Sequence, residues 1–412
     1  MFNSSITKVE SKFMYIENGS ITSVRGFLAA GIHCGLKRKR KDLAMVYSET
    51  SAEAVGTFTL NKAKAAPVII SEEIIKKGKK VKAIIINSGN ANACTGVEGY
   101  LDALEVQKEC TAVLGLNKDK VLVSSTGVIG KKLNVASILN SLGKLKSDLS
   151  RTGGLNAAEA IMTTDLYSKH FALKVKLNKG VVTIGGIAKG SGMIMPNMAT
   201  MLGFFTTDAE INHAVLQSAL SEAVNNSFNK ISVDGETSTN DMVLMLANGM
   251  SKIKVEEGSE DYQLFVSALK DISVKMAKSI VADGEGATKL ITLNIINAPT
   301  DYDANLIAKA IVNSPLVKTA INGGDPNWGR IISAASSCGA DILPENVTLY
   351  FDNLAVVKPN YKIIDDEKEA ANILAQKEIT ITLDLNYGNV KTTWWTCDYS
   401  EEYIKINAHY RT

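Results

Sequence analysis

The sequence contains little proline, few aromatic residues and no long apolar run. Its 412 residues include only 7 Pro, and 45% of them are hydrophobic and 21% charged, which excludes a disordered or collagen-like chain. The longest uncharged apolar stretch, residues 193–205, has 13 residues and contains a proline. A membrane-spanning helix needs about 20 apolar residues, and the first residues lack the apolar core of a signal peptide. We therefore expect a globular, cytoplasmic protein that does not enter a membrane.

A disulfide framework, a metal-ligand spacing and an excess of charge are missing as well. The five cysteines are odd in number and include no C-x-x-C pair; they are Cys34, Cys94, Cys110, Cys338 and Cys397. This pattern favours free thiols in a reducing compartment over disulfides or a zinc site. None of the four histidines lies in a metal-binding spacing such as H-E-x-x-H. With 45 basic and 43 acidic residues, no global field would attract nucleic acid or an anionic membrane.

Two basic runs stand out against this balanced charge, residues 37–41 (KRKRK) and 76–82 (KKGKKVK). Neither run has the interleaved aromatic residues on which nucleic-acid bases stack. We expect each run to be a solvated loop or sheet edge rather than a nucleic-acid surface.

Short β-branched runs that end in Gly, Ser or Asn predict buried strands at residues 81–86, 121–123 and 181–187. Helical spacing of apolar residues predicts one helix over residues 211–228, with Asp208 as its N-cap, and a second over residues 265–280.

The pattern changes after about residue 300. Residues 346–352 (NVTLYFD) and 378–386 (EITITLDLN) alternate with period two, which is typical of half-buried strands. We therefore predict a mixed α/β body over residues 1–300 and a smaller, strand-rich C-terminal α/β domain over residues 301–412.

The densest cluster of unusual residues is KGSGMIMPNMATML at 189–202, with the lone Thr200 in an apolar run. One interpretation is a buried Thr whose hydroxyl bonds to the backbone. The other is an internal nucleophile, because the α-amine of a chain-terminal Thr can act as the base that its hydroxyl needs. Thr200 would gain that amine only if the Ala199–Thr200 peptide bond were cut. The glycines at 185–191 (GGIAKGS) lack the order of a phosphate-binding loop.

The 189–202 segment resembles the cleavage-site signature of the ornithine acetyltransferase (glutamate N-acetyltransferase) family of arginine biosynthesis. Further similar blocks occur along the whole chain in family order; they are 87–96 (NSGNANACTG), 124–130 (SSTGVIG), 232–241 (SVDGETSTND), 322–330 (NGGDPNWGR) and the terminal INAHYRT. The chain is therefore identified as similar to this family over nearly all of its length.

The resemblance implies a self-cleaved enzyme. Cleavage after Ala199 would give an alpha chain of residues 1–199 and a beta chain of residues 200–412, with Thr200 as the nucleophile. Thr126 and Gly127 match the oxyanion-hole pair of the family, one hydroxyl and one backbone N–H. Preorganised donors of this kind stabilise the alkoxide that develops during acyl transfer.

Five more positions match substrate-contacting positions of the family. Together with Thr200 itself they are Thr163, Lys189, Glu285, Asn407 and Thr412. We infer that Lys189 pairs with the carboxylate of an ornithine derivative and Glu285 with its side-chain ammonium. We interpret the loops 234–241 and 322–330 as scaffolding beside the site, and we expect Tyr403, Ile404 and Ile406 to dock the C-terminus as a short strand.

The fold and activity implied by the resemblance are an αββα layered sandwich and the transfer of an acetyl group from N-acetylornithine to glutamate. The mature enzyme would be a heterotetramer of two alpha and two beta chains that needs no metal or organic cofactor. Acetyl-CoA as a second donor stays open. One alternative is an autoprocessed aminopeptidase or amidohydrolase of the same fold, and another is a phosphate-binding protein without catalytic activity.

Overall fold

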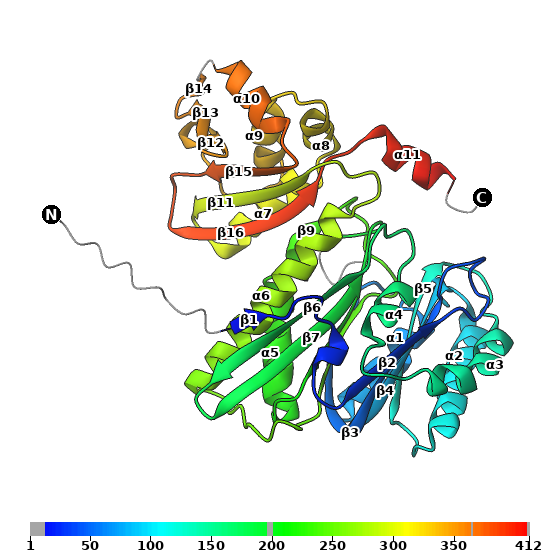
Figure 1. Cartoon of the computed structure of the whole chain (residues 1–412). Helices are drawn as coiled ribbons and strands as arrows, with labels where there is room; N and C mark the ends of the chain where they lie inside the picture. The colour runs from blue at the N-terminus through cyan, green and yellow to red at the C-terminus, as the bar shows by residue number, and fades with distance from the viewer. Residues whose placement is uncertain (1–12, 196–200, 364–365, 410–412) are drawn as a thin grey trace.

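The chain folds around two β-sheets, as the computed structural model of residues 13–195, 201–363 and 366–409 shows (Figure 1). The expected residues Ala199, Thr200 and Thr412 lie outside these described residues. The strand order of the larger sheet is β1 (Phe13–Tyr15), β6 (Lys169–Leu177), β7 (Gly180–Lys189), β8 (Leu202–Thr207), β10 (Met242–Ala247), β3 (Leu43–Phe58), β4 (Val81–Asn90) and β5 (Val121–Val128), and β2 (Phe27–Ile32) pairs with β3.

The long strand β3 divides this sheet into two layers. Its first half pairs with β2 and β4, whereas its second half, from Glu53 to Phe58, pairs with β10. The pairing with β4 changes register between Tyr47 and Ala52. Such irregularities bend a strand and increase its twist, so one strand can serve two layers.

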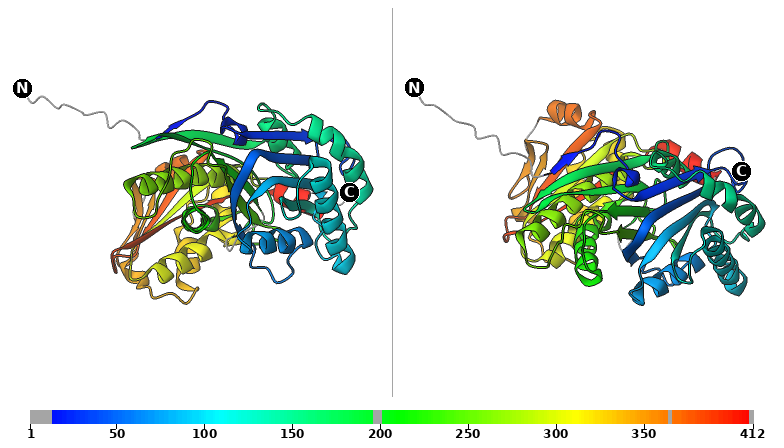
Figure 2. Two further views of the ribbon diagram at one scale, coloured as in Figure 1. Left: turned by 90° about the horizontal axis from the view of Figure 1, so that it is seen from below. Right: turned by 60° about the horizontal axis from the view of Figure 1, so that its bottom comes forward.

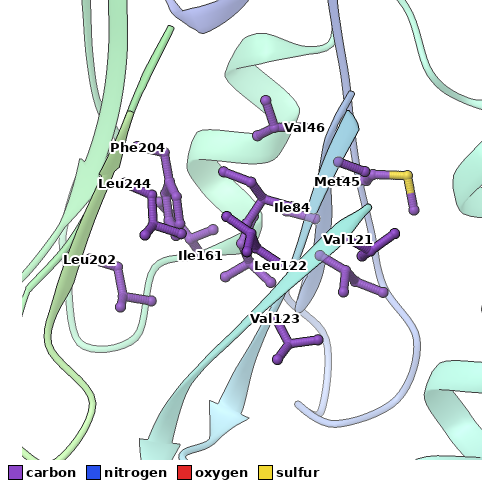
Figure 3. Packing of buried hydrophobic residues seen from close by; sticks show 14 of the residues in the cluster. Met45, Val46, Ile84, Val121, Leu122, Val123, Ile161, Leu202, Phe204 and Leu244 are labelled. Atoms are coloured by element: carbon purple, nitrogen blue, oxygen red, sulfur yellow. The ribbon is translucent and has the colours of Figure 1, made fainter. Parts of the chain in front are cut away.

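Helices cover the outer face of each layer (Figure 2). On one side are α5 (His213–Asn225) and α6 (Glu260–Ala282); on the other are α1 (Ala66–Lys76), α2 (Gly96–Leu114) and α3 (Val135–Ser147). Between the layers, Phe204 and Leu244 from β8 and β10 lie in one apolar cluster with Ile84 and Leu122 from β4 and β5 (Figure 3). The αββα sandwich is therefore confirmed.

The strands of the inner layers have continuous apolar sequences, because both of their faces are covered. Every residue of β8 and of β10 is buried. Strands buried on both faces lose the alternation of half-exposed strands. α6 instead buries one stripe at three- and four-residue spacing, with Phe265, Leu269 and Ile272 among its members.

The smaller sheet has the strand order β14 (Lys362–Ile363), β13 (Leu354–Lys358), β12 (Thr348–Phe351), β15 (Glu378–Asp384), β11 (Leu290–Ala298), β16 (Val390–Cys397) and β9 (Ile231–Ser232). The nearby helices are α7 (Asp301–Val312), α8 (Pro315–Asn322), α9 (Trp328–Ser336) and α10 (Glu367–Leu374). The sheet thus includes β9 and β11, which precede residue 300. Its last long strand also contributes Trp395 and Cys397 to the core beneath α6.

The strands predicted at 81–86, 121–123 and 181–187 and the two predicted helices are confirmed as β4, β5, β7, α5 and α6. The predicted N-cap of α5 is wrong. The side chain of Asn212 caps this helix by accepting a hydrogen bond from the N–H of Val215. Asp208 instead accepts one from the N–H of Thr183, 2.8 Å away. Asp208 therefore links the end of β8 to β7, and Asn212 takes the place of the cap.

The C-terminal segment is a helix, α11 (Glu401–Ala408), and the predicted short strand is wrong. Acidic residues favour a helix N-terminus, and Glu401 and Glu402 occupy the first turn. The rings of Tyr399 and Tyr403, four residues apart, stack with their centroids 5.0 Å apart. In the part of the chain that the structure describes, no helix combines the length and apolar character needed to span a membrane.

Candidate active site

One pocket, of about 230 Å³, lies where the carboxyl ends of β5 and β7 approach the loop after α6 and the helix α11. Its lining residues are Thr126, Gly127, Val128, Ile129, Thr163, Thr164, Lys189, Gly192, Met193, Ser238, Asn240, Glu285 and Asn407. Six of the residues expected from the sequence thus lie around one cavity. The other expected residues, Ala199, Thr200 and Thr412, are outside the described ranges.

Thr126 and Gly127 lie near the carboxyl end of β5, which ends at Val128. Gly127 has a φ of +131°, a conformation that L side chains rarely adopt. A Cβ atom at this position would lie 2.4 Å from the carbonyl carbon of Gly89 and 2.6 Å from the nitrogen of Asn90. Only glycine therefore fits here, and the contact with β4 fixes the backbone beside the buried Thr126 hydroxyl.

Lys189 places a buried cation next to that hydroxyl. Lys189 is the last residue of β7, and only 3% of it is exposed. Its Nζ lies 3.5 Å from Thr126 Oγ1. Burial lowers the pKa of Lys189, and the carboxylate of Asp165 partly opposes this effect. Among the described residues, no carboxylate forms a salt bridge with it. A buried cation without a direct partner favours an anionic ligand, such as a carboxylate.

A buried network of charges holds the strand end that carries Lys189. Asp165 Oδ1 accepts hydrogen bonds from Lys169 Nζ and from the N–H of Gly190, both at 2.8 Å. Its Oδ2 accepts one from the N–H of Thr163 at 2.9 Å. The positive charges of Lys189 and Lys169 hold the pKa of Asp165 well below its usual range despite its burial. One carboxylate thereby fixes two walls of the pocket.

The same network reaches the loop after α6. Lys169 Nζ also donates to Asp283 Oδ2 at 2.5 Å, and both side chains are fully buried. The carbonyl of Asp283 accepts a hydrogen bond from Ser191 Oγ at 2.6 Å, and the carbonyl of Ser191 accepts one from the N–H of Glu285 at 2.9 Å. The glycine-rich bend and the loop that carries Glu285 are therefore locked together.

Glu285 and Asn407 also line the pocket. The Asn407 amide donates to Glu285 Oε2 at 2.9 Å, although the two residues are far apart in sequence. Glu285 is buried, and a Cβ atom on Gly192 would lie 2.3 Å from its Oε2. Gly192 therefore leaves room for the carboxylate, whose other oxygen accepts no hydrogen bond from the described residues.

The sequence did not predict Ser238 and Asn240 as site residues, because the loop 234–241 was expected to be scaffolding beside the site. Both line the pocket, and the amide of Asn240 donates to the carbonyl of Ser125 at 2.9 Å, next to Thr126. Asp241 is 1% exposed and accepts a hydrogen bond from the N–H of Met201 at 3.0 Å. Only the polar run STND between two apolar segments could have indicated these positions.

The other loop assigned to scaffolding, residues 322–330, lies at the junction of α8 and α9 in the C-terminal unit. Asn327 caps α9 by accepting a hydrogen bond from the N–H of Arg330. The described lining of the pocket includes no residue of this loop.

Breaking the buried network should cost far more stability than breaking an exposed ion pair. We expect Asp165→Ala to lower the free energy of unfolding by about 3–5 kcal/mol, because Lys169 would keep one buried partner and two backbone N–H groups would lose theirs. The exposed pair Lys132–Glu98, 3.4 Å apart, is the control, and Glu98→Ala should change it by about 0–1 kcal/mol. Urea denaturation measures both; equal effects would contradict this account of the network.

A pocket with a buried cation, a buried carboxylate and a hydroxyl–glycine pair is typical of an enzyme that acts on a small polar molecule. The chain belongs to the ArgJ family, whose sequence model matches residues 28–412. The resemblance found in the sequence blocks is thereby confirmed.

Two relatives cover nearly the whole chain. The arginine biosynthesis bifunctional protein ArgJ of Caldanaerobacter subterraneus is 47% identical over 407 residues, 97% of this chain and 100% of the relative. The ArgJ protein of Oceanobacillus iheyensis is 44% identical and covers 98% of this chain and 100% of its own length.

Two solved structures are similar to part of the chain. The ArgJ crystal structure from Bacillus halodurans is 44% identical, with a TM-score of 0.43, and covers 45% of this chain and 97% of that chain. The ornithine acetyltransferase of Mycobacterium tuberculosis, solved with ornithine, is 36% identical, with a TM-score of 0.42, and covers 45% of this chain and 98% of that chain.

Proposed function

We propose that this protein transfers the acetyl group of N-acetylornithine to glutamate in arginine biosynthesis, giving ornithine and N-acetylglutamate. The observation that carries the proposal is that six expected site residues line one pocket; they are Thr126, Gly127, Thr163, Lys189, Glu285 and Asn407. Membership of the ArgJ family and relatives named for arginine biosynthesis support the same activity. They do not favour the aminopeptidase alternative.

The pocket has complementary charges at two walls for an amino acid with an ammonium side chain. Lys189 is a buried cation without a direct carboxylate partner among the described residues, and it would pair with the substrate carboxylate. Glu285, held by Asn407, would receive the side-chain ammonium. Ornithine and glutamate derivatives share the carboxylate, so Lys189 can serve both half-reactions.

Catalysis would proceed through an ester on Thr200. Self-cleavage after Ala199 supplies the α-amine, which takes the proton of the Thr200 hydroxyl as that oxygen attacks the acetyl carbonyl. Thr126 and Gly127 would stabilise the oxyanion, and ornithine leaves with the proton. The amine of glutamate then attacks the ester and restores Thr200.

We propose that the active enzyme is a heterotetramer of cleaved alpha and beta chains in the cytoplasm. All five cysteines are free thiols, which supports a reducing compartment. No metal or organic cofactor is needed, because the nucleophile, base and oxyanion donors are all supplied by the chain.

The proposed function is tested by incubating the enzyme with N-acetylornithine, with and without glutamate. Acetyl transfer gives steady ornithine release only with glutamate, and parallel initial-rate plots. Without glutamate, mass spectrometry should find one acetyl group on the fragment that begins at Thr200. Steady ornithine release without glutamate would indicate a hydrolase, and no release at all would indicate a binding protein.

The end of the chain is expected to matter for substrate binding. Terminal residues usually tolerate truncation unless they are tied down. Here Asn407 lines the pocket, and Thr412 follows it by five residues. Deleting residues 411–412 should raise KM for N-acetylornithine at least about tenfold, which is about 1.4 kcal/mol, while self-cleavage proceeds. Steady-state kinetics measures this effect; unchanged kinetics would remove Thr412 from the site.

A further inference from the structure

The loop 234–241 links the two sheets and is rich in buried polar residues. It connects β9 of the smaller sheet to β10 of the larger one. Its last four residues are all polar and buried; they are Ser238, Thr239, Asn240 and Asp241. Burying polar groups costs free energy unless hydrogen bonds compensate for it. The hydrogen bonds that this loop makes therefore indicate its role.

Asp234, at the start of the loop, holds the chain before the expected cleavage site. Its Oδ2 accepts a hydrogen bond from the N–H of Met193 at 2.5 Å, and its Oδ1 accepts one from the N–H of Ile194 at 2.8 Å. The carbonyl of Ile194 accepts another from the N–H of Val233 at 2.8 Å. Met193 has a φ of +57°, which a residue with a side chain rarely adopts. Both oxygens of Asp234 thus keep Met193 and Ile194 in this bend.

Asp241, at the end of the loop, holds the chain after the expected cleavage site. Its Oδ1 accepts a hydrogen bond from the N–H of Met201 at 3.0 Å, and the carbonyl of Met201 accepts one from the N–H of Met242 at 3.3 Å. Asp241 is 1% exposed, and its Oδ2 has no hydrogen-bond partner among the described residues. Burial raises the pKa of this carboxyl well above its usual range. Because a buried, unpartnered oxygen is costly, stability alone does not account for an Asp at this position.

Together the two carboxyl groups hold both sides of the Ala199–Thr200 bond. The nitrogen of Met201 is bonded to the carbonyl carbon of Thr200, so the hydrogen bond to Asp241 limits where Thr200 can lie. On the other side, Ile194 is held five residues before Ala199. A hydroxyl attacks a neighbouring carbonyl efficiently only when the two groups are held in a near-attack geometry. Since one short loop holds both flanks, that loop sets their relative position.

We propose that Asp234 and Asp241 are positioning residues for Thr200, with Asp234 holding the chain before the scissile bond and Asp241 the chain after it. The inference rests on the proposed function, because that function makes Thr200 the reacting residue. Self-cleavage needs both flanks, because the attacking hydroxyl and the attacked carbonyl lie on opposite sides of the bond. Acetyl transfer needs only Asp241, because the cut frees Thr200 from the chain that Asp234 holds. Neither carboxyl has to give or take a proton in either reaction.

The first experiment follows self-cleavage of newly synthesised chains by pulse-chase labelling and denaturing gel electrophoresis. Asp234→Ala and Asp241→Ala should each lower the rate of cleavage at least about tenfold, because each loses hydrogen bonds that fix one flank. For acetyl transfer, kcat per cleaved chain should fall at least about tenfold in Asp241→Ala, with KM for N-acetylornithine within about twofold of the wild type. In Asp234→Ala, kcat per cleaved chain should stay within about threefold of the wild type.

The corresponding amide variants separate positioning from a general loss of stability. An Asn side chain is neutral and keeps one accepting oxygen. Asp241 uses one oxygen among the described residues, so Asp241→Asn should recover both cleavage and kcat to within about threefold of the wild type. Asp234 uses both oxygens, so Asp234→Asn should cut itself nearly as slowly as Asp234→Ala.

The matched control is Asp208→Ala. Asp208 directly follows β8, whereas Met201 directly precedes it. Asp208 is also a buried carboxyl that accepts a hydrogen bond from a backbone N–H, that of Thr183. Its loss should lower the free energy of unfolding in urea about as much as Asp241→Ala does, while cleavage and kcat stay unchanged. A control that slows cleavage as much as Asp241→Ala, or an Asp241→Asn enzyme as slow as Asp241→Ala, would overturn the proposal.

Two further outcomes separate this proposal from the proposed function. Wild-type rates of cleavage and transfer in both Ala variants would overturn the positioning role and leave the proposed function intact. A wild type that cuts itself at rates that depend on Asp234 and Asp241, but transfers no acetyl group, would refute the proposed function and support their positioning role in self-cleavage.

Discussion

Thr200→Ala is expected to leave the protein as one uncut chain without transferase activity. The substitution removes the hydroxyl that attacks the Ala199 carbonyl during processing and the acetyl carbonyl during catalysis. Removing the nucleophile of a comparable enzyme lowers kcat by about 10⁶. Denaturing gel electrophoresis should show fragments of residues 1–199 and 200–412 for the wild type and one full-length band for the variant.

A matched variant separates loss of the nucleophile from loss of the fold. Thr200→Ser keeps a hydroxyl and, after cleavage, an α-amine, so it should still be cut and still transfer acetyl. Far-UV circular dichroism should not distinguish the Ala variant from the cleaved wild type. A wild type that is fully active as a single uncut band would refute the mechanism, because the free amine would never form.

Thr126→Ala is expected to lower kcat by about 10²–10³ with little change in KM. The hydroxyl is buried, and Lys189 Nζ lies 3.5 Å from it, so it is held in a low-dielectric surrounding where donors act strongly on a developing oxyanion. Stopped assays of ornithine release measure the effect.

Two controls test this assignment. Thr126→Ser keeps the hydroxyl and should recover most of the activity. Thr164→Ala removes a hydroxyl that also lines the pocket but has no assigned donor role, so kcat should change by no more than about threefold. A Thr126→Ala enzyme with normal kcat and a raised KM would instead assign Thr126 to substrate binding.

The sequence predicts an element correctly where the spacing of its apolar residues or its composition fits only a helix or only a strand. β4, β5 and β7 are β-branched runs buried on both faces, and α6 repeats its apolar stripe over six turns. α11 was mistaken for a strand, because the spacing of Tyr403, Ile404 and Ile406 fits either period over so few residues. The cap of α5 was misplaced, because Asp208 has the right residue type and its tertiary contact with Thr183 cannot be seen locally.

The site was predicted through its resemblance to a family, and its physical basis needed three dimensions. Nothing local to Asp165 indicates that it joins Lys169, Gly190 and Thr163 in one buried network. Nor can the sequence show that Lys79 and Lys80 pair with carboxylates, since those carboxylates come from distant segments. Pairing between remote charges is decided by the fold.

The strand order has a consequence for a chain cut after Ala199. β7 precedes the cut and pairs with β8, which follows it, and Lys189 lies opposite Leu202. β10 then pairs with β3, so two strands of the second half lie between strands of the first half within one sheet. The two fragments would stay associated without a covalent link, because strand pairings join them within one sheet. Neither half, expressed alone, has neighbours for its edge strands, so two separately purified halves should fail to reassemble an enzyme that the intact precursor builds before it cuts itself.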